Sequence, residues 1–284
     1  MGNLFIVATP IGNLKDMTSR AIETLKEVDI ILCEDTRTSL KLLNHFDIKN
    51  KLISYHKFNE TKQTEKIIED LKEGKNIALI SDAGTPCVSD PGYILVNEAK
   101  KEKIKVIPIG GISASITALS ASGLNSDKFV FQGFYPRETK DKNKLIKEIK
   151  DSNIKTHILY ESPKRIEKTL GYIYDNLGNI SISVYRELTK MHETNYHGNI
   201  SEVIKQLNED ENKSKGEYTF IIEKTIEEKA KTSISIESLL INEMIKNNIT
   251  LKEAIEKINS ENDNFNKKEI YNASLNLKEL IKKI

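Results

Sequence analysis

The chain has 284 residues, with 43 Lys and Arg against 42 Asp and Glu and a formal net charge of +1. This balance excludes a global electrostatic field that would draw the protein onto DNA or anionic lipid, so any contact with nucleic acid must be local. The first apolar run, within MGNLFIVATPIGN, has no basic lead and is too short for a signal sequence or a membrane span. Two cysteines, Cys33 and Cys87, cannot form a zinc site alone and have no secretory context, so we expect a reducing, cytoplasmic environment and no metal.

Strands and helices alternate through residues 1–123. Apolar runs predict strands at 4–8, 29–33, 52–54, 76–80 and 106–109. Apolar residues at helical spacing predict helices near 21–28, 40–46, 67–71, 93–103 and 113–123. Because strand and helix alternate, we expect right-handed βαβ units, a mostly parallel sheet and a first α/β domain over residues 1–123.

A polar segment with turn residues, 123–128, leads into a second region, whose strands are expected in FVFQGF, THILYES, ISISVYREL and EYTFIIE. Helices are expected near 142–150, 163–176 and 201–207, the second of them starting at Pro163 with Ser162 as its N-cap. Beyond Glu223 the pattern predicts only short helices, broken at Asn247–Asn248 and at 262–266. The predicted fold class is therefore α/β, with two α/β domains, 1–123 and 124–224, and a small helical C-terminal extension over 225–284.

Three unusual loops follow strands of the first domain: ATPIGNLKDMT (8–18), SDAGTPCVSDPG (81–92) and IGGISAS (109–115). In an open parallel sheet, ligands bind beyond the carboxyl ends of the strands, where loop amides and helix N-termini point outward. Each loop is rich in small residues, which let the backbone approach a ligand closely. No loop matches the dinucleotide or P-loop fingerprint, so we expect one shared ligand site of another kind rather than three ordinary turns.

Several carboxylates stand at strand ends and are candidates for acid-base chemistry. Glu34 and Asp35 end the second strand, although capping of the next helix explains an acidic residue there equally well. Asp82 is the first polar side chain after a buried strand; it suits a ligand hydroxyl or amine, and an Asx-turn is the alternative. His56 and Glu60 follow the third strand, where a lone histidine is more often solvated than catalytic.

Charged residues also gather in two segments of the second domain, YESPKR and YREL. Glu161, Arg165, Arg186 and Glu187 could pair with one another across the domain or line a substrate cleft, and both explanations stay open. Residues 137–168 carry a local excess of Lys and Arg, which would attract RNA phosphates but which a solvated helix face also explains.

Several motifs in register resemble the tetrapyrrole methylase superfamily: VATPIGNLKDMTSRAIETL, CEDTRTS, YHKFNE, ISDAGTPCVSDPG, GGISASITALSASG, FQGFYPR, YESPKRI and YRELTKMHE. The resemblance covers about residues 3–223 and continues in ITLKEAIEKI and KKEIYNASL of the tail. Within the superfamily the chain most resembles members that methylate ribosomal RNA of the small subunit. Its first loop, ATPIGN, lacks the G-x-G-x-G-D pattern typical of tetrapyrrole-modifying relatives, which argues against a uroporphyrinogen or precorrin substrate.

The resemblance implies a cytoplasmic bacterial enzyme that uses S-adenosylmethionine to methylate the ribose 2′-oxygen of a cytidine in 16S ribosomal RNA, near the decoding centre. It also implies two α/β domains of the class III methyltransferase type, with the cofactor in the cleft between them, and a homodimer. The family's cofactor positions fall on Pro10, Ile11, Gly12, Asp82, Ala83, Gly84, Thr85, Gly111, Ser113, Ala114 and, from the second domain, Tyr160.

Transfer to a ribose hydroxyl needs a group that accepts its proton. Three carboxylates at strand ends lead the candidate bases, namely Glu187, Glu34 and Asp35; the further candidates are His56, Glu60 and Glu161. Guanidinium groups match phosphate oxygens, so arginines lead the candidate substrate residues, which are Arg37, His56, Glu60, Arg165 and Arg186.

The near-neutral charge suggests a structured target, the assembled small subunit rather than free RNA. Two other classes of function stay open. A methylase of a small molecule, such as a tetrapyrrole or a modified amino acid, would share the cofactor site, and a non-catalytic ribosome-assembly factor would retain only the fold.

Overall fold

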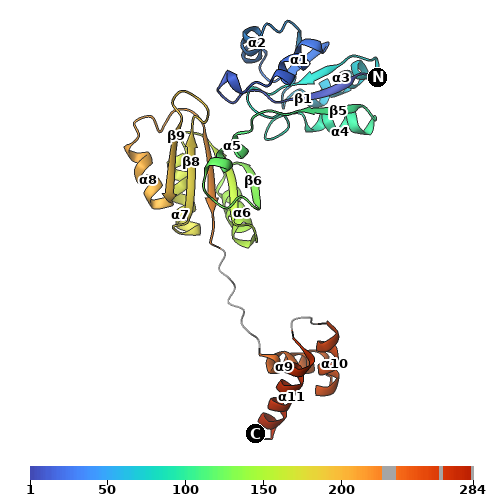
Figure 1. Cartoon of the computed structure of the whole chain (residues 1–284), viewed down its shortest axis with the longest axis vertical. Helices are drawn as coiled ribbons and strands as arrows, with labels where there is room; N and C mark the ends of the chain where they lie inside the picture. Colours follow the sequence, from blue (N-terminus) through green and yellow to red (C-terminus); the bar gives the residue numbers. More distant parts are fainter. Residues whose placement is uncertain (226–234, 262–264, 283–284) are drawn as a thin grey trace. The chain divides into compact units, whose positions relative to one another are not determined.

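The computed structural model describes residues 1–225, 235–261 and 265–282. The chain divides into two compact units, Met1–Thr225 and Ile226–Ile284. The first unit contains two β-sheets and their helices, and the described residues of the second unit form helices (Figure 1). The predicted α/β class with a helical C-terminal extension is confirmed.

The first α/β domain is built on a five-stranded parallel sheet in the order β3-β2-β4-β1-β5. Its strands are β1 (Asn3–Val7), β2 (Ile30–Cys33), β3 (Lys51–Ser54), β4 (Ile77–Leu79) and β5 (Lys105–Ile109). Its helices are η1 (Leu14–Asp16), α1 (Ser19–Glu27), α2 (Thr36–His45), α3 (Glu60–Lys72), α4 (Tyr93–Lys101) and α5 (Ala114–Ala121). As predicted, strands and helices alternate.

Both faces of this sheet are covered, which explains why the central strands are uninterrupted apolar runs. Buried residues of α3 and α4, such as Ile67 and Leu95, pack on one face. Residues of α1 and α2, such as Leu25 and Leu43, pack on the other. Every residue of β2 and β4 is buried. Because all five strands are parallel, their carboxyl ends meet at one edge.

The second α/β domain contains a mixed five-stranded sheet in the order β6-β7-β10-β8-β9. Its strands are β6 (Phe129–Phe134), β7 (Thr156–Glu161), β8 (Ser181–Arg186), β9 (Thr194–Asn199) and β10 (Tyr218–Glu223). Only the β6 and β7 pair is parallel. The helices α6 (Thr139–Asp151), α7 (Ile166–Leu177) and α8 (Ile200–Glu209) share one core with this sheet.

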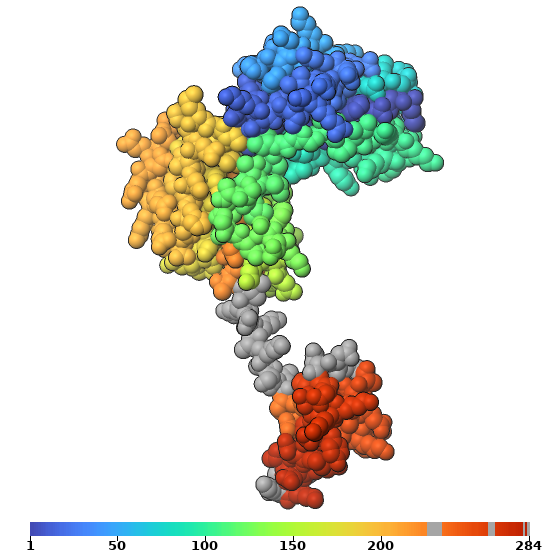
Figure 2. Space-filling view, in the orientation of Figure 1, coloured from blue at the N-terminus to red at the C-terminus, as the bar shows by residue number. Residues whose placement is uncertain are grey.

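The small-residue helix α5 packs on the opposite face of this second sheet. Its Ala118 and Leu119 are buried against Ile158, Tyr185 and Ile221. The last helix of the first domain therefore also serves as a cover for the second, and the two domains form one continuous body in the space-filling view (Figure 2).

Two local predictions are wrong. Strand β9 was not expected, because TNYHGN lacks a clear apolar pattern; only Tyr196 is buried, and β8 provides the pairing partner. The helix expected from Pro163 begins instead at Ile166, with Arg165 at its N-cap. Residues 163–165 form a turn in which the Ser162 carbonyl accepts hydrogen bonds from the amides of Arg165 (3.0 Å) and Ile166 (3.2 Å).

The C-terminal unit contains α9 (Ile236–Asn247), α10 (Leu251–Glu261) and α11 (Lys267–Ile281) around a small core that includes Leu240, Ile258 and Ile270. The predicted break at Asn247–Asn248 is confirmed, with Asn248 in the left-handed conformation that ends many helices. Of the second predicted break, residues 262–264 lie outside the described residues. Within residues 1–225, 235–261 and 265–282, none of the helices combines the length and apolar character needed to span a bilayer.

Candidate active site

The three loops singled out in the sequence follow β1, β4 and β5, which are neighbours in the sheet. Thr9 and Gly84 form an isolated antiparallel bridge, with N to O distances of 2.9 and 3.1 Å. The Thr85 hydroxyl donates to the Ile112 carbonyl (3.5 Å), which connects the second loop to the third. The expected convergence of the three loops at one edge is therefore confirmed.

Gly111 provides the close contact between the first and third loops. A Cβ atom on this residue would lie 2.8 Å from the Cβ of Ala8, nearer than real Cβ atoms approach. Gly111 lines neither of the two cavities at this edge. This close approach packs the third loop on the first, and the role of Gly111 in cofactor binding stays a prediction.

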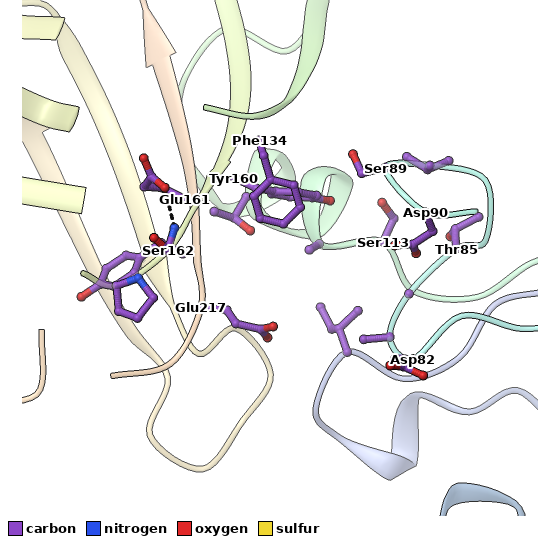
Figure 3. A pocket seen from close by; sticks show the side chains of 18 residues that line it. Asp82, Thr85, Ser89, Asp90, Ser113, Phe134, Tyr160, Glu161, Ser162 and Glu217 are labelled. Carbon is purple, nitrogen blue, oxygen red and sulfur yellow. Dashed lines mark hydrogen bonds between the residues drawn. The ribbon is translucent and has the colours of Figure 1, made fainter. Parts of the chain in front are cut away.

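A cavity of about 380 Å³ lies between these loops and the second sheet (Figure 3). Its lining from the first domain comprises Ile11, Asp82, Ala83, Gly84, Thr85, Val88, Ser89, Asp90, Ser113 and Ala114. From the second domain it comprises Phe134, Tyr160, Glu161, Ser162, Pro163, Glu217, Tyr218 and Thr219. We call this space the first cavity. Eight of the predicted cofactor residues line it, namely Ile11, Asp82, Ala83, Gly84, Thr85, Ser113, Ala114 and Tyr160.

Aromatic rings form the second-domain side of the first cavity. Tyr160 contacts Phe134 edge to face, with ring centroids 5.4 Å apart, and Phe131 at 5.0 Å. Figure 3 shows Phe134 and Tyr160 together, with Ser113, Asp90 and Thr85 on the first-domain side. Burial raises the pKa of the Tyr160 phenol, although hydrogen bonding with Ser115 opposes the rise. The phenol is therefore neutral at physiological pH and presents a polar tip on an apolar wall.

Asp90 lines the first cavity but was not among the predicted site residues. Burial raises the pKa of its carboxyl to about 6; hydrogen bonding with Ser81 opposes the rise, and the charges of Glu34 and Asp82 add to it. A half-buried acid with a perturbed pKa is a frequent mark of a functional site. Asp90 lies in the second loop, within SDPG, but nothing in the local sequence distinguishes it from an ordinary turn residue.

A second cavity of about 350 Å³ adjoins the first. It is lined by Pro10, Ile11, Gly12, Leu14, Thr38, Ser39, Lys41, Leu42, Ser81, Asp82, Ala83, Lys190 and Glu217. Ile11, Asp82, Ala83 and Glu217 line both spaces and form their shared wall. Asp82 and Glu217 lie on opposite sides of the first cavity in Figure 3. Of the predicted cofactor residues, Pro10 and Gly12 line the second cavity alone.

Glu187 lines neither cavity. Its Oε1 accepts hydrogen bonds from Lys190 Nζ (2.8 Å) and from the Glu217 amide (3.0 Å). The residue is in the left-handed conformation (φ 55°), which is uncommon outside glycine. This carboxylate is engaged by a cation and a backbone amide, so its geometry does not favour a role as base.

The other two predicted bases also lie outside both cavities. Burial raises the pKa of Glu34, and the charge of Asp82 adds to the rise, whereas His56 opposes it. The Asp35 carboxylate caps α2 by accepting from the Arg37 amide (2.8 Å), and it also pairs with the Arg37 side chain at 2.9 Å. These bonds from Arg37 lower the pKa of Asp35 to about 2. Helix capping, the alternative explanation for this position, accounts for Asp35.

The predicted substrate residues of the first domain surround the same sheet edge without lining either cavity. The Arg37 side chain is 88% exposed beyond its pairing with Asp35. His56 Nδ1 accepts from the Phe58 amide at 3.2 Å. Glu60 begins α3, and its Oε2 accepts from the Gly92 amide at 3.4 Å, so this carboxylate helps to hold the end of the second loop.

The two predicted substrate arginines of the second domain have partners inside the protein. Arg165 pairs with Glu161 at 2.5 Å, and the Glu161 side chain is fully buried. Arg186 is 6% exposed; it pairs with Asp210 at 3.2 Å and donates to the Thr194 hydroxyl at 2.9 Å. These contacts favour internal pairing over binding of RNA phosphates, with Asp210 rather than Glu187 as the partner of Arg186.

Sequence reasoning also missed Phe134 and Glu217 as lining residues. Phe134 stands in the quoted FQGFYPR motif, so a signal existed. Glu217 precedes β10, and its approach to the first domain depends on the insertion of β10 between β7 and β8. Over the ranges that the structure describes, no group of three or more His, Cys, Asp or Glu side chains is arranged to hold a metal ion.

The comparisons with known proteins agree with this architecture. Residues 3–204 match the family model of the tetrapyrrole (corrin/porphyrin) methylases. The chain is 46% identical over 275 residues to ribosomal RNA small subunit methyltransferase I of Halalkalibacterium halodurans, covering 95% of this chain and 94% of the relative. The protein of the same name from Bacillus subtilis is 44% identical over 278 residues, covering 96% and 94%.

Two solved structures share the fold at low sequence identity. Uroporphyrin-III-C-methyltransferase from Thermus thermophilus matches with a TM-score of 0.55 at 17% identity, over 78% of this chain and 94% of that chain. Diphthine synthase matches with a TM-score of 0.60 at 14% identity, over 78% and 90%. On the family model and the two full-length relatives together, the chain belongs to the tetrapyrrole (corrin/porphyrin) methylase family.

Proposed function

We propose that this protein methylates the ribose 2′-oxygen of a cytidine in 16S ribosomal RNA, within the small ribosomal subunit. One observation carries the proposal: a pair of adjoining cavities, with carboxylates in their shared wall, occupies the edge where the family's loops meet. The relatives named as ribosomal RNA methyltransferases match nearly the whole chain, which supports ribosomal RNA as the substrate class.

S-adenosylmethionine is the methyl donor, and the first cavity fits its chemistry. Small residues such as Gly84 and Ala114 let the backbone approach a nucleoside closely. Tyr160 and Phe134 offer apolar surface, and the Asp90 carboxylate suits a cationic ligand. When bound there, the donor supplies an electrophilic methyl group on a positively charged sulfur.

The chain's own task is to position the acceptor oxygen and to remove its proton. Positioning in line with the methyl carbon can contribute about 7 to 11 kcal/mol to lowering the barrier. Asp82 and Glu217 are the carboxylates in the shared wall, and Glu217 pairs with Lys190 at 3.0 Å. Asp82 Oδ1 accepts from the Asp35 amide at 3.2 Å, and Oδ2 has no hydrogen-bond partner among the residues described. We therefore propose Asp82, rather than Glu187, Glu34 or Asp35, as the acceptor of the 2′-hydroxyl proton.

The proposal includes a cytoplasmic, homodimeric enzyme whose target is the assembled subunit. The near-neutral charge of the chain supports recognition of a structured target over binding to any exposed RNA backbone. Equal methylation of protein-free 16S RNA and of subunits would remove this part of the proposal. Sedimentation of the purified protein at several concentrations would test the dimer.

The decisive experiment offers labelled S-adenosylmethionine and small subunits from cells that lack this protein. We expect label in 16S RNA, at one cytidine that becomes resistant to alkaline cleavage on its 3′ side, as 2′-O-methylation requires. Subunits from wild-type cells are the control and should accept little label. Label on the base, or none despite measurable binding of the donor, would contradict the proposal. Label that appears only in a tetrapyrrole or an amino acid would indicate a methylase of a small molecule. Binding to subunits without consumption of the donor would indicate a non-catalytic assembly factor.

A further inference from the structure

We propose that the second cavity is the pocket for the acceptor nucleoside, which enters it unstacked from a single-stranded segment of RNA. This inference rests on the proposed function, since it assigns the place where the substrate of that reaction binds. Sequence-specific recognition of RNA commonly uses bases that are splayed out of the stack and held in such pockets.

Its position relative to the first cavity is the first argument. A methyl group passes between donor and acceptor only when the reacting atoms are in contact, so the two binding sites must be adjacent and share lining residues. The two cavities share Ile11, Asp82, Ala83 and Glu217. Asp82, the proposed proton acceptor, thus faces both spaces, as a base between donor and acceptor must.

The residues that line the second cavity suit a nucleoside. Leu14 and Leu42 offer apolar contacts to a base or sugar, while Thr38 and Lys190 offer polar ones. Ser39 also lines this cavity and is 2% exposed; its hydroxyl hydrogen bonds with the Cys33 thiol and has no nitrogen or oxygen partner in the described part of the chain. A thiol is a weak hydrogen-bond partner, so the polar edge of a ligand would satisfy this hydroxyl better.

The mouth of the second cavity suits the flanking backbone of an RNA strand. Leu14, Thr38 and Lys41 are exposed there. No ion-pair partner for Lys41 occurs within residues 1–225, 235–261 and 265–282, so its charge is available to a phosphate. Arg37, on the same helix and 88% exposed, adds a second cation near this rim.

Substitutions on the exposed surface of α2 test the pocket without disturbing the core. Thr38→Tyr places a large ring at the mouth, and Asn44→Tyr places the same ring on the same helix outside both cavities. We expect both variants to bind S-adenosylmethionine within about twofold of the wild-type affinity, as exposed substitutions usually permit. Single-turnover methylation of small subunits should fall by at least about 100-fold for Thr38→Tyr and stay unchanged for Asn44→Tyr, because misplacement of the acceptor has an effect of that size.

Lys41→Gln gives a second, milder readout. It should raise KM for subunits and weaken the dependence of KM on salt, with kcat retained, because it removes one phosphate contact and its counterion release. Wild-type methylation by Thr38→Tyr, or a parallel loss of its donor affinity, would overturn the pocket assignment. If the wild-type enzyme does not methylate subunits, the proposed function is wrong. If the wild-type enzyme methylates them and Thr38→Tyr does so equally well, only the pocket assignment is wrong.

Discussion

Lys190 of the second domain lies directly against Gly12 of the first: a Cβ atom on residue 12 would be 2.3 Å from Lys190 Cγ. The ammonium group of the same lysine pairs with Glu187 at 2.8 Å and Glu217 at 3.0 Å. Burial alone would lower the pKa of Lys190, but the hydrogen bonds to Glu187 and Glu217 have a larger combined effect. The pKa of Lys190 therefore lies above its ordinary value. Lys190 thus stays charged and joins the two domains beside the second cavity.

The first prediction follows from this contact. Gly12→Ala should force the Lys190 stem aside and lower the free energy of unfolding by about 1 to 3 kcal/mol, the usual cost of an added group in a tight contact. Part of that cost is backbone strain at φ 157°, which is independent of Lys190. Urea denaturation of Gly12→Ala, Lys190→Ala and the double variant separates the two contributions. We expect a coupling of at least about 0.5 kcal/mol, and strictly additive losses would show that the contact is unimportant.

Asp90 leads to a pH prediction. The pKa of its carboxyl is about 6 in the folded protein, against about 3.9 in an unfolded chain. Between these values the unfolded chain has released the proton that the folded chain retains, so the free energy of unfolding falls as pH rises through this window. Below the window both states are protonated, and above it both are ionised.

Asp90→Asn should remove this contribution. Compared with the wild type, the variant should gain stability between about pH 4 and about pH 7, as urea denaturation at both values would measure. Asp127→Asn changes an exposed aspartate outside both cavities and is the matched control. An Asp90→Asn variant whose stability parallels that of the wild type across the window would contradict the assignment. We also expect the wild-type affinity for the cationic donor to rise with pH through the same window, and the variant's affinity to stay flat.

A substitution at Arg165 distinguishes a structural role of the Arg165–Glu161 ion pair from a role of Arg165 in binding RNA. Arg165→Met leaves the Glu161 carboxylate buried without its cation, which should lower the free energy of unfolding by about 3 kcal/mol. The Ser162 amide and the Thr169 hydroxyl still donate to Glu161, at 2.7 Å each, so the domain should fold. Adding Glu161→Gln removes the unpaired charge and should recover part of the loss. A raised KM for subunits with unchanged stability would instead support contact with RNA.

The assignment of the base is tested by two amide substitutions. Asp82→Asn should reduce the single-turnover rate at saturating donor by about 100- to 10,000-fold, the range expected when a general base is lost. Glu187→Gln keeps its shape and the hydrogen bond from the Glu217 amide, and its rate should stay within about threefold of wild type. Donor affinity, measured by calorimetry, shows whether Asp82→Asn acts on binding instead. The reverse pattern, with Glu187→Gln inactive and Asp82→Asn active, would restore Glu187 as the base.

The sequence by itself determined the alternation of strands and helices, the parallel first sheet and the place of the three loops. These features follow from local apolar periodicity and from the geometry of parallel strands, whose carboxyl ends lie at one edge. Motifs such as ISDAGTPCVSDPG also pointed to the methylase family, and eight of the cofactor residues inferred from them line the first cavity.

Only the tertiary structure decided which charged groups meet. Arg186 pairs with Asp210 and Lys190 pairs with Glu217, and both pairings depend on how separate elements pack. Burial likewise sets the pKa of Asp90, which no local pattern encodes. The physical reason is that apolar periodicity reports which face of an element is buried, whereas the partner of an ionised side chain depends on contacts between segments far apart in the chain.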